Sequence, residues 1–294
     1  MDKSKVSIAA ILTCHNRKEK TLTCLKNLMS QDGIINVDLD VYLVDDGSSD
    51  GTAVAVKKNF PEVNILKGDG TLYWNGGMRY AFSIAKKSDY DYYLWLNDDT
   101  FLNSDALTLL LETSNNIKFK NSREIIVTGT IMDIDTGKVN YGGRNKKSKL
   151  QRLKFVQLES STEPQQCDTF NGNVVLIPRN VVQKIGNISP EYSMQHGGDF
   201  DYGLRAKYAG FESWVAPGVL GTCSSNSIKD TIFDTDLSLK ERRKKMNTPR
   251  GVPPAKEWMI FAKRHAGFLW PFYWIRTIVR VVFPWTYLLF RKPQ

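Results

Sequence analysis

The strongest constraint on this fold is a regular alternation of short apolar runs with amphipathic segments over the first 111 residues. Apolar, β-branched runs predict strands, and apolar residues at every third or fourth position predict helices. Strands that alternate with helices form parallel βαβ units. The sequence therefore predicts an α/β fold with a Rossmann-like, mostly parallel central sheet and helices on both faces. We expect strands at Val6–Thr13, Asp40–Val44, Val63–Leu66 and Tyr92–Leu96, and helices at Lys18–Ser30, Thr52–Asn59, Met78–Lys87 and Ser104–Leu111.

The second half of the chain is less regular. Ile125–Ile131 and Asn173–Ile177 are apolar enough to predict strands, and "VNYGGR" with Gln151–Leu158 predicts the pieces of a hairpin. Helices are expected at Pro178–Ile185 and Asp199–Tyr208, because Pro favours the first turn and Gly210 suits the end.

Polar residues gather where the four predicted strands of the first half end. They are His15-Asn16-Arg17, Asp45-Asp46-Gly47-Ser48, the loop "GDGTLYWNGG" and Asn97-Asp98-Asp99. In open α/β sheets ligands bind beyond the carboxyl ends of the strands, where the strand order reverses. The four loops are therefore predicted to form one site.

The segment "LWLNDDT" places two acids directly after an apolar strand. Neighbouring carboxylates repel each other, and the repulsion grows where water is scarce, so a cation is expected beside them. Mg²⁺ and Mn²⁺ prefer oxygen ligands and often share them with a diphosphate. We therefore predict a divalent metal at Asp99, together with Asn97 or Asp98. The alternative is a helix cap, but Asn103, Ser104 and Asp105 are closer to the next helix.

Two further segments carry paired acids. In "VDDGSSDGT", Asp45 and Asp46 end a strand, where they can cap the next helix or accept hydrogen bonds from a nucleobase or ribose. In "HGGDFDYGLRAKYAG", favourable charge at a helix start and an i,i+4 ion pair with Arg205 explain Asp201. Asp199 follows two glycines and is better placed to enter a cleft as a general base.

These motifs occur in the order found in a known family. "ILTCHNR", "VDDGSSDGT", "LNDDT", "FNGNVVLIPR" and "GGDFDYGLRAKYAGF" resemble the motifs of family 2 glycosyltransferases of GT-A fold, over residues 6–218. Members are inverting enzymes that use nucleotide-diphospho-sugars, and "LNDDT" stands in the position of their DxD motif. "GTLYWNGGMRYAF" resembles a loop of bacterial, rhamnosyltransferase-like members that build surface polysaccharides such as capsule and O-antigen.

The resemblance implies a role for individual residues. Asp45 would contact the base, Asp99 would ligate the metal with support from Asp98, and Asp199 would be the catalytic base. The chain departs from the family at Asn97, the first DxD position, and at Gly198, where the family has Glu, so Asp201 stays an alternative to Asp199. The remaining predicted nucleotide-sugar-binding residues are Thr13, His15, Arg17, Asp46, Gly70, Trp74, Asn75, Gly76, Asn97 and Asp98, and the predicted acceptor or supporting residues are Asn171, Asp201 and Arg205.

The basic charge of the chain belongs to its C-terminal part. Residues 240–294 hold thirteen Lys or Arg and two Glu, a net charge of +11, whereas the whole chain has +9. Residues 1–239 then hold 27 basic and 29 acidic residues, a net charge of −2, so the charge does not indicate nucleic-acid binding. We therefore expect a glycosyltransferase domain at residues 1–229 and a basic helical tail at residues 230–294.

The tail is rich in aromatic residues, among them Trp270, Trp274, Trp285 and Tyr287. Arg276 and Arg280 interrupt it, which argues against a membrane-spanning helix and favours helices that lie on an anionic membrane surface. The alternatives are a helical appendage packed on the domain or a contact in a homodimer.

The sequence favours an enzyme that moves a sugar from a UDP- or dTDP-sugar to a polyprenyl-linked glycan on the cytoplasmic face of the plasma membrane. Neither a secretory leader nor CxxC spacing is apparent, which fits a cytoplasmic protein. A sugar nucleotidyltransferase would need a glycine-rich phosphate loop after the first strand, and "TCHNRKEK" lacks that glycine. The remaining alternative is a membrane-docking module without catalytic activity.

Overall fold

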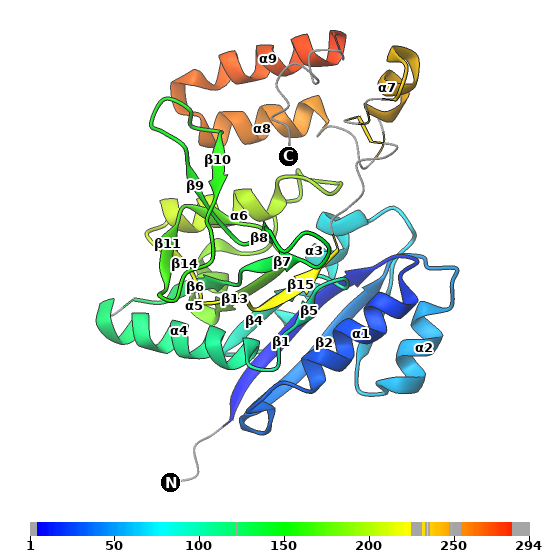
Figure 1. Ribbon diagram of the computed structural model, residues 1–294, viewed down its shortest axis with the longest axis vertical. Coiled ribbons are helices and arrows are strands. Elements are labelled where there is room, and N and C mark those ends of the chain that lie inside the picture. Colours follow the sequence, from blue (N-terminus) through cyan, green and yellow to red (C-terminus); the bar gives the residue numbers. More distant parts are fainter. Residues whose placement is uncertain are drawn as a thin grey trace.

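The computed structural model describes residues 5–121, 123–224, 231–232, 234, 236–246, 248 and 254–283. Its main sheet has the strand order β11-β14-β6-β13-β4-β1-β2-β3. The four strands of the first half are parallel to one another, and antiparallel β13 joins them to the second half of the sheet (Figure 1). The strands are β1 (Val6–Cys14), β2 (Val37–Asp45), β3 (Asn64–Lys67), β4 (Tyr92–Leu96), β6 (Ile125–Thr128), β11 (Gln165–Cys167), β13 (Val174–Pro178) and β14 (Glu212–Val215).

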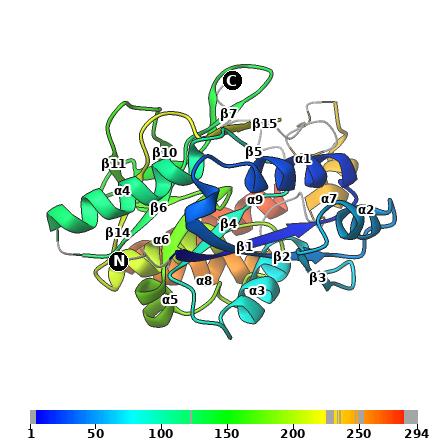
Figure 2. The ribbon, with the colours of Figure 1, turned by 90° about the horizontal axis from the view of Figure 1, so that it is seen from below.

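Helices cover both faces of the sheet, as the sequence predicts, and Figure 2 shows the sheet between them. One face packs against α1 (Lys18–Met29), α2 (Thr52–Asn59) and α4 (Ala106–Asn121). The other packs against α3 (Tyr73–Ala85), α5 (Arg179–Ile185) and α6 (Gly198–Tyr208). The central strands β1 and β4 are mostly buried between these helices, which explains why they are apolar at almost every position, whereas β2 and the edge strand β3 carry polar residues and are partly exposed.

Several predicted boundaries are wrong. The helix predicted at Ser104–Leu111 continues to Asn121, and the strand predicted from Asp40 begins at Val37. The run predicted as one strand at Ile125–Ile131 is split between β6 in the main sheet and β7 (Ile131–Asp133) in a smaller sheet of order β5-β15-β7-β8. The helix expected from Met78 begins at Tyr73 instead, so "WNGG" is helical. Glycine is required there because a Cβ on Gly77 would collide with Oγ1 of Thr13 in β1. The other members of the smaller sheet are β5 (Phe101–Leu102), β8 (Val139–Tyr141) and β15 (Gly221–Cys223).

A hairpin rises from the sheet toward the C-terminal helices. Its strands, β9 (Gly143–Lys146) and β10 (Phe155–Gln157), pair antiparallel, and β12 (Thr169–Phe170) pairs with β9 on the other side. The sequence thus predicts the hairpin but not its first strand, because the "VNY" part of "VNYGGR" forms β8 of the smaller sheet and the hairpin begins at Gly143. Helices α8 (Ala255–His265) and α9 (Trp270–Val282) lie side by side across the top of α6 and the hairpin (Figure 1).

Apolar side chains fix α8 to the rest of the molecule. Phe261 packs with Tyr192 and Leu204 in a small core that also contacts Phe155 and Trp258. The remaining helical segments are α7 (Leu239–Met246) and the short turns η1 (Ile34–Asn36) and η2 (Gly267–Leu269). No helix within the described ranges is both long and apolar enough to span a bilayer. The predicted division at residue 229/230 falls among residues 225–230, which lie outside the described residues, as do Trp285 and Tyr287.

Candidate active site

The acid pair after β4 has an arginine as its cation. The Nη1 atom of Arg17, which follows β1, donates to Asp98 Oδ1 at 3.0 Å and to Asp99 Oδ2 at 2.8 Å. Both carboxylates are buried, with 4% and 8% of their surface exposed. Since β1 and β4 are neighbours in the sheet, the ends of these two strands place the guanidinium and the two acids together. Arg17 thus supplies positive charge at the place where the sequence led us to expect a cation.

The energetics of this cluster follow from its burial. Burial raises the pKa of Asp98 to about 7, although Arg17 opposes the shift. Burial by itself would lower the pKa of Arg17, but the two carboxylates outweigh it and raise that pKa. Oδ2 of Asp98 also accepts a hydrogen bond from Thr21 at 3.3 Å. Asp98 is therefore fully engaged by side chains of the protein.

Asp99 is the acid best suited to a metal. Its Oδ1 atom makes no hydrogen bond within the described part of the chain, whereas Asn97 Oδ1 already accepts one from Trp74 at 2.7 Å. No group of three or more His, Cys, Asp or Glu among the described residues is placed to hold a metal ion. One carboxylate oxygen plus a substrate diphosphate fits the way Mg²⁺ is commonly held. The residues thus fit a metal ligated by Asp99, and the second ligand from Asn97 or Asp98 stays a prediction.

The second acidic pair holds a loop and leaves one oxygen open. Asp46 is buried and accepts the backbone N–H groups of Gly70 at 2.8 Å and Tyr73 at 2.9 Å. Within the described residues, Asp45 accepts one hydrogen bond, from the Ser48 N–H to its Oδ1 at 2.9 Å. His15 Nδ1 lies 2.5 Å from the Asp46 carbonyl oxygen. Asp46 therefore positions the loop after β3, and Asp45 keeps an oxygen that can accept from a ligand.

The start of α3 links this loop to the acid pair. Tyr73 has a φ of +52°, a strained conformation for a residue with a side chain, and its N–H is held by Asp46. Next along the chain, Trp74 donates to Asn97 and packs edge-to-face on Trp95, with ring centroids 6.1 Å apart. Asn75 is fully buried and donates to the His196 carbonyl at 3.1 Å, which ties α3 to the segment before α6. Gly76 packs against Leu72.

Asp199 lies in the first turn of α6, next to this segment. Its Oδ1 accepts the Phe200 N–H at 2.8 Å and its Oδ2 the Gly172 N–H at 3.0 Å. Burial raises its pKa to about 6, against these two hydrogen bonds and the nearby Arg144. Gly172 also packs against the Trp74 ring, so Trp74 and Asp199 meet at Gly172. A carboxyl with such a pKa can take up a proton near neutral pH.

Asp201 occupies a different environment from Asp199. It is completely buried, and its oxygens accept from Arg205 Nε at 2.7 Å, Tyr192 OH at 3.1 Å and Arg264 Nη1 at 3.2 Å. His265 Nε2 lies 2.9 Å from Oδ1 of Asp201. Burial would raise the pKa of Asp201, but His265 and Arg205 lower it. Asp201 and Arg205 thus lie away from the cluster around Trp74, in a joint between α6 and α8.

Sequence reasoning missed some residues beside Asp199. The guanidinium of Arg144 on β9 lies 5.7 Å from the centre of the Phe200 ring, and its Nε donates to Asn171 at 2.9 Å. Trp258 of α8 belongs to the small core that includes Phe200. Neither residue stands in a motif, because each reaches the site from a segment distant in the sequence. The excess of aromatic residues in the tail was the only signal for Trp258.

Curated proteins with similar sequences are polysaccharide synthases. The poly-beta-1,6-N-acetyl-D-glucosamine synthase of Staphylococcus aureus (strain COL) is 26% identical over 189 residues, which cover 61% of this chain and 41% of the synthase. The enzyme of the same name from Staphylococcus epidermidis is 24% identical over 194 residues. The chain thus matches about two fifths of the length of these relatives.

Solved structures show the same fold. GalNAc-T7 with UDP, GalNAc and Mn²⁺ matches with a TM-score of 0.55 and 15% identity, over 77% of this chain and 45% of that chain. S. aureus TarS 1–349 matches with a TM-score of 0.52 and 12% identity, over 88% and 70%. The GT-A fold expected from the motifs is thereby confirmed. Residues 9–186 match the model of glycosyl transferase family 2, so the chain belongs to this family.

Proposed function

We propose that this chain transfers a sugar, with inversion, from a UDP- or dTDP-sugar to a hydroxyl group of a lipid-linked glycan in bacterial polysaccharide synthesis. The observation that carries the proposal is the Asp199 carboxyl at the start of α6, with a pKa raised to about 6. It lies beside the Trp74–Asn97 pair at the end of β4, on the side of the sheet where α/β enzymes bind ligands. The GlcNAc-polymer synthases similar to this chain support the choice of reaction.

The donor would bind along the strand ends. Asp45 has an oxygen that can accept from the base or ribose, while Asp46, Gly70 and Tyr73 fix the loop beside it. The diphosphate would then lie near Arg17 and Asp99, and Trp74 would cover the sugar. Asp199 would remove the proton from the accepting hydroxyl as that oxygen attacks the anomeric carbon from the face opposite the diphosphate.

Two cations are available to the leaving diphosphate. Mg²⁺ or Mn²⁺ at Asp99 would neutralise negative charge on the leaving group when bound. GalNAc-T7 was solved with Mn²⁺ and UDP. The mannosyltransferase PcManGT from Pyrobaculum calidifontis was solved with Mn²⁺ and GDP-Man. PcManGT matches with a TM-score of 0.52 and 13% identity, over 89% of this chain and 65% of that chain. Arg17 is a permanent cation in the same cluster, and its contact with Asp99 would have to adjust when a metal binds.

The acceptor would come from a membrane. Helix α9 exposes Phe272, Ile275, Val279 and Val282, which are spaced as one helical stripe. Lysine and arginine are concentrated in the same part of the chain. An apolar stripe within a basic segment suits the surface of an anionic bilayer. We therefore place the enzyme on the inner face of the plasma membrane as a peripheral protein.

Calorimetric titration tests the donor site. UDP and dTDP are titrated into the full chain with and without Mn²⁺, for wild type and for Asp99→Ala. We expect binding of at least one nucleotide that strengthens with Mn²⁺ and loses this dependence in Asp99→Ala. Binding that ignores both Mn²⁺ and Asp99 would reject the metal and leave Arg17 as the cation. Absence of binding by both UDP and dTDP would overturn the proposed donor class.

A further inference from the structure

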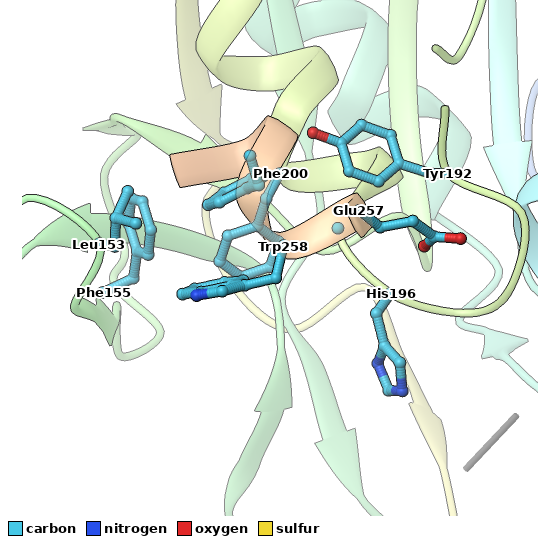
Figure 3. A pocket seen from close by; sticks show the side chains of 9 residues that line it. Leu153, Phe155, Tyr192, His196, Phe200, Glu257 and Trp258 are labelled. Carbon is cyan, nitrogen blue, oxygen red and sulfur yellow. The ribbon is translucent and has the colours of Figure 1, made fainter. Parts of the chain in front are cut away.

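An apolar pocket of about 230 Å³ lies between α6, α8 and the β9–β10 hairpin. Figure 3 shows the rings of Phe155, Phe200 and Trp258 arranged around it. Its wall also contains Gly197 and Phe200, which stand on either side of Gly198 and Asp199 in the sequence. The donor site described above uses none of these aromatic side chains. The remaining lining residues are Leu153, Tyr192, His196, Glu257 and Phe261.

The residues that line the pocket determine which kind of ligand it can bind. Phe155 meets Phe200 edge-to-face at 5.2 Å, and Trp258 stacks on Phe261 at 5.5 Å with 17° between the rings. The one acid in the wall, Glu257, is buried and directs Oε1 to the N–H of Ser193 at 3.1 Å and to its hydroxyl. Apart from Oε2 of Glu257, which has no hydrogen-bond partner among the described residues, a sugar would find few such partners on these walls, and its hydroxyl groups would be costly to bury. A hydrocarbon chain meets no such cost and gains from burial.

A cation stands between this pocket and Asp199. Arg144 lies over Phe200, which lines the pocket, and its charge acts on Asp199. In the described part of the chain, Asn171 is the only hydrogen-bond acceptor for its side chain, so both Nη groups are available to a ligand. Burial lowers the pKa of Arg144, because the loss of water outweighs the attraction of the nearby Asp199 carboxylate. This environment favours binding of an anion beside the pocket.

We propose that the pocket and Arg144 together form an acceptor subsite for a prenyl phosphate or diphosphate, with the first part of the hydrocarbon chain in the pocket and the phosphate at Arg144. The proposal rests on the proposed function and specifies how its acceptor is held. The sugar attached to the phosphate would then extend from Arg144 toward Asp199. The apolar stripe on neighbouring α9 lets the rest of the prenyl chain remain in the bilayer.

The test measures binding of farnesyl diphosphate, farnesol and inorganic pyrophosphate to the full chain by calorimetry, without donor and below the critical micelle concentration of each lipid. We expect farnesyl diphosphate to bind more tightly than either of the other two. Trp258→Ala and, from the opposite wall, Phe155→Ala should each weaken farnesyl diphosphate and farnesol by about tenfold or more. Arg144→Gln should weaken farnesyl diphosphate by about tenfold and leave farnesol within about twofold.

Matched controls are Phe119→Ala and Arg123→Gln, which change exposed residues at the end of α4 and just after it. Circular dichroism in the near ultraviolet shows whether each variant keeps its packing, and Phe155→Ala replaces Trp258→Ala if the latter unfolds. Equal binding of pyrophosphate and farnesyl diphosphate, or control variants as weak as the pocket variants, would overturn the subsite.

The pocket and the proposed function can fail separately. Slow hydrolysis of the donor sugar needs nucleotide-sugar and water but no acceptor. If UDP or dTDP binds, the corresponding donor is hydrolysed, and no prenyl diphosphate binds, then the subsite is wrong and the glycosyltransferase stands. If no nucleotide binds, the proposed function fails, and the acceptor subsite fails with it.

Discussion

Asp199 and Asp201 are two residues apart on one helix, yet their surroundings give them opposite acid strengths. Burial raises the pKa of Asp199 to about 6, whereas the surrounding donors lower the pKa of Asp201. A base must be able to accept a proton. The Asp201 carboxylate is held by two arginines, a histidine and a tyrosine, which stabilise its ionised form, so it accepts a proton less readily. The contrast supports Asp199 as the base and Asp201 as a structural residue.

The raised pKa of Asp199 predicts the pH dependence of activity. The base works only when ionised, so kcat/KM should fall on the acid side with an apparent pKa of about 6. Asp199→Asn should reduce kcat by about 10² to 10⁴-fold and abolish that limb of the profile, measured by release of nucleoside diphosphate. A variant that retains wild-type activity and the same acid limb would remove Asp199 from catalysis.

The same shift has a consequence for stability. Because the folded pKa lies above the ordinary value of 3.8, the folded state binds the proton more readily, and this stabilisation is lost as pH rises through about 4 to 6. At neutral pH the ionised Asp199 is then unfavourable to folding. Asp199→Asn should therefore unfold no more easily than wild type at pH 7 in urea, which separates its loss of activity from any loss of structure.

At the scale of elements, the strand ends could be predicted from the sequence and the start of α3 could not. Apolar runs such as Tyr92–Leu96 end abruptly at polar residues, so the place of Asp98 and Asp99 follows from the pattern alone. Gly76 and Gly77 suggest a loop by propensity, but tertiary contact decides otherwise, since α3 approaches β1 too closely for a side chain at Gly77. Arg17 contacts the acid pair, and Arg144 contacts Phe200. These contacts join segments that are far apart in the sequence, so no local sequence pattern predicts them.

The close approach of α3 to β1 gives a direct prediction. Gly77→Ala would place a methyl group against Thr13 Oγ1, so helix or strand must shift, at a cost of about 1–3 kcal/mol in the free energy of unfolding. Ser83→Ala on the exposed face of the same helix is the control and should change it by less than about 0.5 kcal/mol. Urea unfolding measures both. Equal stability of Gly77→Ala and wild type would mean that the glycine has no packing role.

The contact between α6 and α8 ties the C-terminal helices to the helix that carries the proposed base, Asp199. Asp201→Asn would remove the charge that compensates Arg205 and Arg264 and should lower the free energy of unfolding by about 3 kcal/mol. The acid limb of kcat/KM should stay at about pH 6, because Asp199 is unchanged. Asp89→Asn, at the exposed ion pair with Arg179, is the control and should cost less than about 1 kcal/mol. A shift of the acid limb in Asp201→Asn would instead indicate that Asp201 titrates in catalysis.

At the scale of the whole molecule, charge and exposed apolar surface coincide. The excess of positive charge belongs to the last 55 residues of the sequence, and residues 1–239 are slightly acidic. Helix α9 lies outermost on α8 (Figure 1) and buries Tyr273 against Ala262 and Ala266, while Phe272 and Ile275 remain 63% and 56% exposed. An acidic body would be repelled by an anionic bilayer, so this end of the molecule is the one that can approach it.

This uneven distribution of charge and exposed apolar surface predicts how the enzyme binds a membrane. The double variant Phe272→Glu, Ile275→Glu places two charges in the apolar stripe of α9, and we expect at least tenfold weaker co-sedimentation with vesicles containing anionic lipid. Wild-type binding should weaken with added salt, because part of it is attraction between basic side chains and headgroups. The control is the double variant Ile35→Glu, Phe119→Glu, which introduces charge at two exposed apolar residues of the catalytic domain and should leave binding unchanged.

If the α9 variant sediments with vesicles as wild type does, the stripe does not contact lipid. If it instead converts a dimer into a monomer in analytical ultracentrifugation, the stripe is a subunit contact, and the membrane-bound acceptor must be reached by another surface.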